Sequence, residues 1–228
     1  MNNQYPGWEL KYFDKAKNFR DYQFSLIRNF IKKNVAEVGP GNGIHIKSYL
    51  KLSKTINLFE PTKKNFLYLK KNFKKNNNIK LHNQIFKLEE NKYDTILYLD
   101  VLEHIKNSKA ELIKAFKSLK KDGHLIINVP AFQHLYSDFD NDVGHFKRYQ
   151  KKDFKNLIEI LKPQVTLKFY YDSFGYILSL LSKIFLKKYK KKFNKKIKIW
   201  NRLIFISKII DILTFNIFGK SLLIIIKK

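Results

Sequence analysis

Short apolar runs alternate with amphipathic segments along most of this chain, and this alternation limits the possible folds more than any other feature. Strands are expected at 34–38, 55–60, 79–85, 93–100, 124–130 and 165–171, and SLLIIIKK at 221–228 predicts one more. Helices are expected between them at about 14–32, 43–53, 62–75 and 107–120. Gly123 is expected to stop the last of these helices. This order predicts a parallel sheet with helices on both faces, and a ligand at the carboxyl ends of the strands.

Three glycines follow the first expected strand, in the segment EVGPGNG at 37–43. A loop between a strand and a helix N-terminus offers unpaired N–H groups, and glycine lets the backbone approach a ligand closely. The spacing of Gly39, Gly41 and Gly43 is G-x-G-x-G, which departs from the dinucleotide fingerprint G-x-G-x-x-G and lacks the Lys-Ser/Thr of a phosphate-binding loop. The segment disfavours a nicotinamide or flavin ligand, and a tight structural turn is the alternative.

An acidic residue, Glu60, ends the second expected strand. It lies at about the ~20-residue distance at which a carboxylate can bind the ribose hydroxyls of a nucleotide. The alternative is an acidic surface residue before Pro61. Together with the glycine loop, Glu60 favours a ligand that contains adenosine.

Four segments, EVGPGNG, FEP, KYDTILYLDVLEHI and LKKDGHLIINVPA, resemble the ordered motifs of class I S-adenosylmethionine-dependent methyltransferases. The resemblance covers roughly residues 14–170 and is strongest to the branch around quinone-ring O-methyltransferases. It implies one domain over 1–228 with a Rossmann-like three-layer α/β/α fold, whose mostly parallel seven-stranded sheet has an antiparallel last strand. It also implies S-adenosyl-L-methionine as the cofactor and S-adenosyl-L-homocysteine as its product.

The same resemblance implies roles for individual residues. The cofactor-binding set is Glu37, Gly39, Pro40, Gly41, Gly43, Glu60, Pro61, Leu99 and Asp100. In it the glycine loop faces the methionine part, and Glu37 reaches the methionine amino group. Glu60 holds the ribose, while Leu99 and Asp100 border the adenosine and the sulfonium. The adenine contact is not readable, and Gln84 and Ile85 are only positional guesses.

The segment FDNDVGHFKRY at 139–149 resembles the D-x-x-x-G-H-x-R-R-Y segment of a bacterial methyltransferase subgroup, with Lys147 in place of the first arginine. It is expected beside the methyl donor. A hydroxyl acceptor must lose a proton, and histidine is the side chain best suited to accept it near neutral pH. We predict His145 as this base, oriented by Asp140, with His104 as the rival. The alternative is a loop latch in which Asp140 pairs with Arg148.

Other catalytic chemistries lack support in the sequence. The chain has no cysteine, its six histidines are scattered without a pair at ligand spacing, and there is no G-x-S-x-G elbow. We therefore predict no metal site.

A lysine-rich segment at 174–218 is expected to be a helical insertion before the last strand. Within it Phe185, Tyr189, Phe193 and Ile197 recur every fourth residue among lysines, which predicts a basic amphipathic helix at about 185–198. The favoured interpretation is a roof over the acceptor pocket. The formal charge of +27 keeps two alternatives open, namely attachment to an anionic membrane and, less favoured because arginine is scarce, binding of nucleic acid.

The sequence thus predicts a methyltransferase that methylates oxygen on a small, sugar-like or lipid-linked acceptor. The alternatives are an RNA methyltransferase and a non-catalytic protein that binds S-adenosylmethionine. The N-terminal segment does not resemble a secretory signal, and no uncharged apolar run reaches the ~18 residues of a membrane span. A cytoplasmic location is expected, with peripheral membrane contact as an option.

Overall fold

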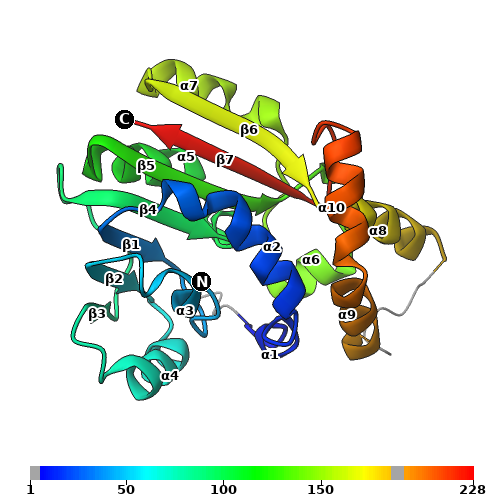
Figure 1. The fold of residues 1–228 in the computed structure, drawn as a ribbon, viewed down its shortest axis with the longest axis horizontal. Helices are drawn as coiled ribbons and strands as arrows, with labels where there is room; N and C mark the ends of the chain where they lie inside the picture. The colour runs from blue at the N-terminus through cyan, green and yellow to red at the C-terminus, as the bar shows by residue number, and fades with distance from the viewer. Residues whose placement is uncertain (1–5, 186–192) are drawn as a thin grey trace.

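A computed structural model describes residues 6–185 and 193–228 of the chain. Its centre is one seven-stranded sheet with the order β3-β2-β1-β4-β5-β7-β6 (Figure 1). The strands are β1 (Asn34–Val38), β2 (Thr55–Phe59), β3 (Ile79–His82), β4 (Tyr93–Leu99), β5 (Leu119–Pro130), β6 (Val165–Tyr171) and β7 (Ser221–Lys227). Strands β1 to β5 pair in parallel, whereas β7 runs antiparallel to both of its neighbours, β5 and β6. The predicted mostly parallel sheet with an antiparallel last strand is confirmed.

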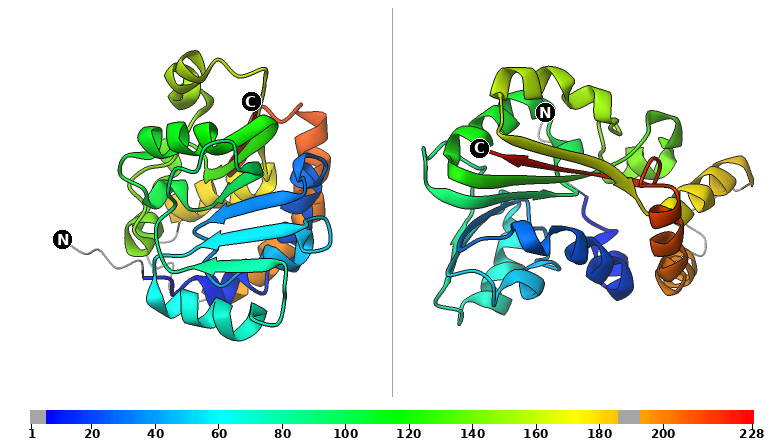
Figure 2. Two further views of the ribbon diagram at one scale, coloured as in Figure 1. Left: turned by 90° about the vertical axis from the view of Figure 1, so that its left-hand side faces the viewer. Right: turned by 45° about the horizontal axis from the view of Figure 1, so that its top comes forward.

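Helices cover both faces of this sheet, as Figure 2 shows from two further directions. They are α1 (Leu10–Phe13), α2 (Lys17–Ile27), α3 (Ile46–Tyr49), α4 (Lys63–Phe73), α5 (Ser108–Ser118), α6 (Asp138–Val143), α7 (Lys155–Leu161), α8 (Ser173–Phe185), α9 (Phe193–Arg202) and α10 (Ile204–Leu213). Side chains alternate across each strand, so Ala36 and Ile96 join the core under α5 and α7. Val35 and Leu97 join the second core, under α2, α3, α4, α9 and α10.

Several helices and strands are shorter in the structure than the sequence predicts. The helix expected at 14–32 is α2, which ends at Ile27 and is followed by a 3₁₀ turn at Arg28–Phe30. The helix expected at 43–53 shrinks to the four residues of α3, because the glycine loop occupies the chain up to His45. The strand expected at 79–85 ends at His82.

The start of β5 corrects the prediction about Gly123. Helix α5 ends at Ser118, and the next residue, Leu119, is already extended and pairs with Tyr93 of β4. Asp122 then adopts a positive φ of 62°, and its N–H donates to the Lys228 carbonyl. Gly123 therefore lies in an irregular part of a 12-residue strand, and it does not end the helix.

Helices α8, α9 and α10 form a cap between β6 and β7, and two buried carboxylates tie this cap to the sheet. Asp211 on α10 accepts a hydrogen bond from the Tyr22 hydroxyl at 2.7 Å and from the Asp172 N–H at 2.8 Å. The Asp172 carboxylate accepts from Trp200 Nε1 at 2.9 Å and from Ser207 Oγ at 2.7 Å. Because every partner is fixed, the cap has one defined position over the ends of the strands.

The helix predicted at 185–198 is only partly described. Residues 186–192, which include Tyr189 and five lysines of the predicted helix, lie outside the described residues. Helix α9 begins at Phe193. Within residues 6–185 and 193–228, no helix is both long and apolar enough to cross a membrane.

Candidate functional site

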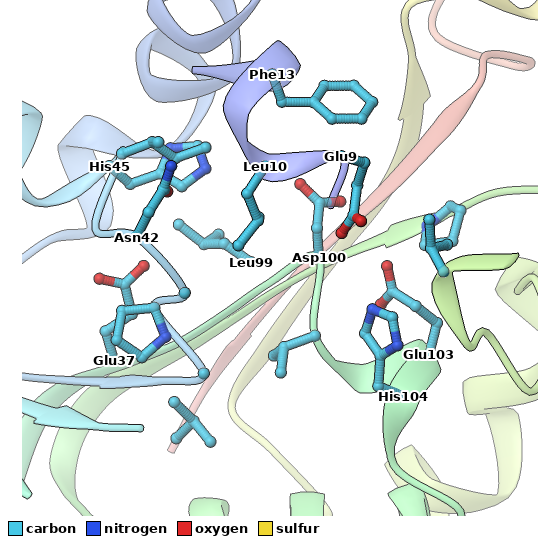
Figure 3. A pocket seen from close by; sticks show the side chains of 18 of the residues that line it. Glu9, Leu10, Phe13, Glu37, Asn42, His45, Leu99, Asp100, Glu103 and His104 are labelled. Atoms are coloured by element: carbon cyan, nitrogen blue, oxygen red, sulfur yellow. The ribbon is translucent and has the colours of Figure 1, made fainter. Parts of the chain in front are cut away.

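A cavity of about 980 Å³ opens at the carboxyl ends of β1, β2, β4 and β5, which is where the sequence predicts the ligand (Figure 3). Its walls include nine of the eleven predicted site residues, namely Glu37, Gly39, Pro40, Gly41, Glu60, Pro61, Leu99, Asp100 and His145. Gly43 and Asp140 are not among the lining residues. Of the two positional guesses for an adenine contact, Ile85 lines the cavity and Gln84 does not.

The glycine loop takes its shape from close backbone packing. Gly39 has a φ of +65°, and a Cβ at this position would lie 2.3 Å from Val101 Cγ2. Its N–H donates to the Phe59 carbonyl at 2.9 Å, which fixes the loop against β2. Gly43, with a φ of +75°, faces away from the cavity, and a Cβ there would lie within 3 Å of Ile46, Leu69 and Phe73. Gly43 therefore allows the loop to pack on α3 and α4.

Glu60 is 4% exposed and is held by the backbone around it. Its Oε2 accepts a hydrogen bond from the Gly41 N–H at 3.0 Å, and its Oε1 accepts one from the Thr62 N–H at 2.8 Å. Burial raises the pKa of Glu60, and these hydrogen bonds partly oppose that effect. The carboxylate is thus fixed in the lining of the cavity.

Glu37 occupies the end of β1 and accepts a hydrogen bond from the Tyr49 hydroxyl. Burial raises its pKa to about 7; the Tyr49 hydrogen bond lowers the pKa, and the nearby charge of Glu60 raises it. Glu37 therefore changes charge near neutral pH.

Asp100 lies at the centre of the cavity, where Figure 3 shows it between Glu37 and Glu103. Its φ of 56° turns the chain at the end of β4. Its Oδ1 accepts from Asn128 Nδ2 at 2.6 Å, and its Oδ2 accepts from Gln23 Nε2 at 3.4 Å. The surrounding protein raises the pKa of Asp100 by removing water from the carboxylate, and these two hydrogen bonds oppose that effect. Asp100 is the residue that directly follows β4.

Two buried side-chain amide oxygens have no hydrogen-bond partner among the described residues. They are Gln23 Oε1 and Asn42 Oδ1. Both residues line the cavity. A buried acceptor without a partner costs free energy, so these atoms suit the donor groups of a bound ligand.

Asp140, His145 and Arg148 come together at the edge of the cavity. Asp140 is fully buried and binds Arg148 through two hydrogen bonds, from Nε at 2.9 Å and from Nη2 at 3.0 Å. It also lies 2.7 Å from His145 Nδ1. Burial alone would raise the pKa of Asp140, but the His145 hydrogen bond and the Arg148 charge outweigh burial and lower the pKa to about 2. The predicted latch and the predicted Asp140–His145 pair therefore exist at the same time.

The proton positions in this pair follow from the charge of Asp140. An ionised carboxylate can only accept hydrogen bonds, so the short contact requires a proton on His145 Nδ1. The other nitrogen, Nε2, lies 3.8 Å from Glu103 Oε1. An imidazole nitrogen is thus presented to a cavity that His145 and Glu103 both line.

Glu103 and His104 complete a cluster that the sequence analysis did not predict. Glu103 is 2% exposed, and its pKa is raised well above the usual range by burial and by the charge of Asp100. The His104 ring lies edge-on to the His145 ring, with 4.8 Å between their centroids. Burial and the charge of His145 lower the pKa of His104 to about 4. The histidines are far apart in sequence, and the turn after α6 brings them together.

Aromatic side chains from distant segments cluster beside the cavity, where Phe13 and Phe139 are part of its lining. The Phe193 ring, at the start of α9, contacts the rings of Trp8, Tyr12, Phe13 and Phe139. Ile197, one turn further, is 6% exposed. The two described members of the predicted apolar stripe therefore pack inward, as expected for a roof.

Lys220, just before β7, also lines the cavity and was not predicted. Its Nζ lies 4.5 Å from the centroid of the Trp200 ring, and burial lowers its pKa. Gln23, Glu103 and Lys220 carry no recognisable motif. Only Glu103 had an available signal, its place four residues after the end of β4 in LEHI.

The sequence matches the profile of a family described as "Methyltransferase domain" over residues 10–166. The chain belongs to this family. No curated protein matches it in sequence.

The fold of this methyltransferase domain recurs in solved structures. An S-adenosylmethionine-dependent methyltransferase from Archaeoglobus fulgidus is 16% identical, with a TM-score of 0.64 over 97% of this chain and 98% of that one. Phosphoethanolamine N-methyltransferase 2 from Haemonchus contortus is 13% identical. Its complex with phosphomonomethylethanolamine and S-adenosylhomocysteine gives a TM-score of 0.65, over 100% of this chain and 58% of that one. Its other structure contains S-adenosyl-L-methionine. At these identities the likeness concerns the fold.

Proposed function

We propose that this S-adenosylmethionine-dependent methyltransferase methylates a hydroxyl oxygen of a small, sugar-like or lipid-linked acceptor. The observation that carries the proposal is the Asp140–His145 pair, which presents an imidazole nitrogen to the cavity as the proposed base. A nitrogen or carbon acceptor that starts without a removable proton would not need such a base.

The residues of the donor side fit S-adenosylmethionine. Glu60 offers two fixed acceptors for the ribose hydroxyls, and Glu37 can carry a negative charge opposite the methionine amino group. Gln23 and Asn42 offer buried acceptors that have no partner among the described residues. The donor, when bound, supplies a methyl group on a positively charged sulfur that becomes neutral on transfer. Solved proteins of this fold contain this donor or its product, which supports the same role here.

The acceptor side needs three contributions from the chain. His145 Nε2 takes the proton of the acceptor hydroxyl, and Asp140 fixes the imidazole in the required tautomer through Nδ1. Arg148 keeps Asp140 ionised, because both of its hydrogen bonds favour the charged carboxylate. The aromatic roof excludes water and orients the acceptor, which is the main requirement of an in-line displacement.

A lipid-linked acceptor would bring the protein to a membrane, and the cap offers a surface for that contact. Apolar side chains are exposed along α10 and after it: Phe205, Ile209, Ile212, Leu213, Phe215 and Ile217. In a chain with a formal charge of +27, such a surface suits an anionic membrane. We propose this surface for the membrane contact instead of the helix predicted at 185–198, because Phe193 and Ile197 of α9 pack inward.

One experiment tests the reaction and its alternatives together. The purified full chain is given methyl-labelled donor with water-soluble metabolites, with lipids in anionic or neutral vesicles, or with RNA. We expect label in an ether linkage of a metabolite or lipid, with labelling of vesicle lipid greater when the vesicles are anionic. Label on nitrogen or carbon, or in RNA, would overturn the proposal. Donor binding without any labelled product would instead favour the non-catalytic alternative.

A further inference from the structure

Three side chains that line the cavity hold atoms able to bind a metal close to one another. Glu103, His104 and His145 each offer one ligand atom, and these atoms all lie within 4.8 Å of one another. Figure 3 shows Glu103 and His104 on the same wall of the pocket. Glu103 and His104 belong to the turn after β4, whereas His145 follows α6, so the cluster joins two separate segments.

Both histidines have the hydrogen bond that orients a metal-binding imidazole. His104 Nδ1 lies 3.1 Å from the Gly144 carbonyl, which can only accept, so Nδ1 carries the proton. His145 Nδ1 is held in the same way by the Asp140 carboxylate. In metal-bound histidines a carbonyl or carboxylate commonly fixes the tautomer through Nδ1 in this way.

Glu103 provides an independent observation. Its side chain is buried, yet Oε2 has no hydrogen-bond partner in the described part of the chain. Its Oε1 is 3.8 Å from His145 Nε2, too far for a hydrogen bond. A buried carboxylate oxygen rarely lacks a partner without a reason, and a site for a bound ion is one of the common reasons.

We propose that Glu103, His104 and His145 bind one divalent transition-metal cation at the acceptor side of the cavity. Two imidazole nitrogens and one carboxylate suit Zn²⁺ and its spectroscopic substitute Co²⁺, and three protein ligands leave a position for water or an acceptor oxygen. His145 Nε2 can bind either a proton or the cation. In the metal-bound protein the cation would lower the pKa of an acceptor hydroxyl, and the released proton would pass to solvent water because His145 would then be a ligand.

Cobalt binding tests this site directly, using the full chain without a histidine tag and stripped of metal by a chelator. We expect one Co²⁺ per chain, with the visible absorption of a four- or five-coordinate site, and displacement by Zn²⁺. His104→Ala and Glu103→Gln should each weaken binding by more than about 100-fold, since loss of an outer hydrogen-bond partner alone costs about 10- to 100-fold. His134→Ala, which removes an exposed histidine bonded to Tyr176, should bind cobalt like the unmodified protein.

Two results would overturn the site: no cobalt or zinc binding by the unmodified chain, or equal binding by both cluster variants. If Glu103→Gln fails to fold by circular dichroism, the partly exposed His104→Ala decides. The readout is absorbance and metal content, so its failure would leave methyl transfer untouched. Conversely, a protein that gives no labelled product could still bind cobalt here.

Discussion

The proposed donor side and the proposed acceptor side of the cavity are built in different ways. On the donor side, Glu37, Gly41 and Glu60 come from two neighbouring parallel strands and the loop after the first, and backbone N–H groups hold the key carboxylate. On the acceptor side, His145 follows α6, and Phe193 comes from the cap. The first arrangement depends on local backbone geometry, whereas the second depends on side chains that meet only after the whole domain has folded.

The two sides also differ in their electrostatics. Burial dominates the donor-side carboxyl groups, so the pKa values of Glu37 and Glu60 are raised. On the acceptor side, His145 and Arg148 outweigh burial, and the pKa of Asp140 falls to about 2. Glu37 can therefore change charge when a ligand binds, while Asp140 keeps its negative charge across the physiological range.

If the two sides act independently, His145→Ala should have the largest effect of these variants on turnover and should leave donor affinity unchanged. We expect turnover to fall by about 10²- to 10⁴-fold, the usual contribution of a general base, because His145 is the proposed acceptor of that proton. Calorimetry should show S-adenosylhomocysteine affinity within about twofold of the unmodified protein, and His134→Ala serves as the matched histidine control. A large loss of donor affinity in His145→Ala would show that the two sides are coupled.

Glu60→Ala should produce the opposite pattern. Loss of a charge-assisted hydrogen bond costs about 1.5–3 kcal/mol, which corresponds to a roughly 10- to 150-fold weaker affinity for S-adenosylhomocysteine. Glu60→Gln keeps the shape and one acceptor, so it should lose less. Binding of NAD should be weaker than that of S-adenosylhomocysteine in the unmodified protein. Comparable or tighter NAD binding would contradict the assignment of the donor side.

A smaller effect is expected from pH, through Glu37. Its raised pKa of about 7 means that the carboxyl group is mostly protonated at pH 6 and mostly ionised at pH 8. A ligand ammonium group favours the ionised form, so S-adenosylhomocysteine should bind about tenfold more weakly at pH 6 than at pH 8. Glu37→Gln should remove this dependence. The same slope in Glu37→Gln would assign it to another group.

The sequence predicted the donor side better than the acceptor side. Strands β1 and β6 begin and end where their patterns predict, because short apolar runs bounded by polar residues allow little choice. The glycine loop and Glu60 were predicted from spacing alone. Gly43 was assigned to the ligand because spacing cannot show which side of a loop packs on helices.

On the acceptor side, the sequence predicted contacts between side chains only within a recognisable motif. Asp140 and His145 share one segment, so their pairing could be proposed from the sequence. The approach of His104 to His145 could not, because it depends on how the turn after α6 packs on the turn after β4. Gly123 was misassigned for a related reason, since pairing of Leu119 with Tyr93 outweighs a local helix-stop signal.

Strand β7 follows every other strand in sequence, yet it lies between β5 and β6 in the sheet. Among the described residues β6 pairs with no strand other than β7, so β6 cannot join the sheet until residues 221–227 have been made. On a ribosome that adds about 5–20 residues per second, the donor loop and its parallel strands emerge first, and the acceptor wall is completed last. The growing chain can therefore form its nucleoside pocket before it has a place for the molecule to be methylated.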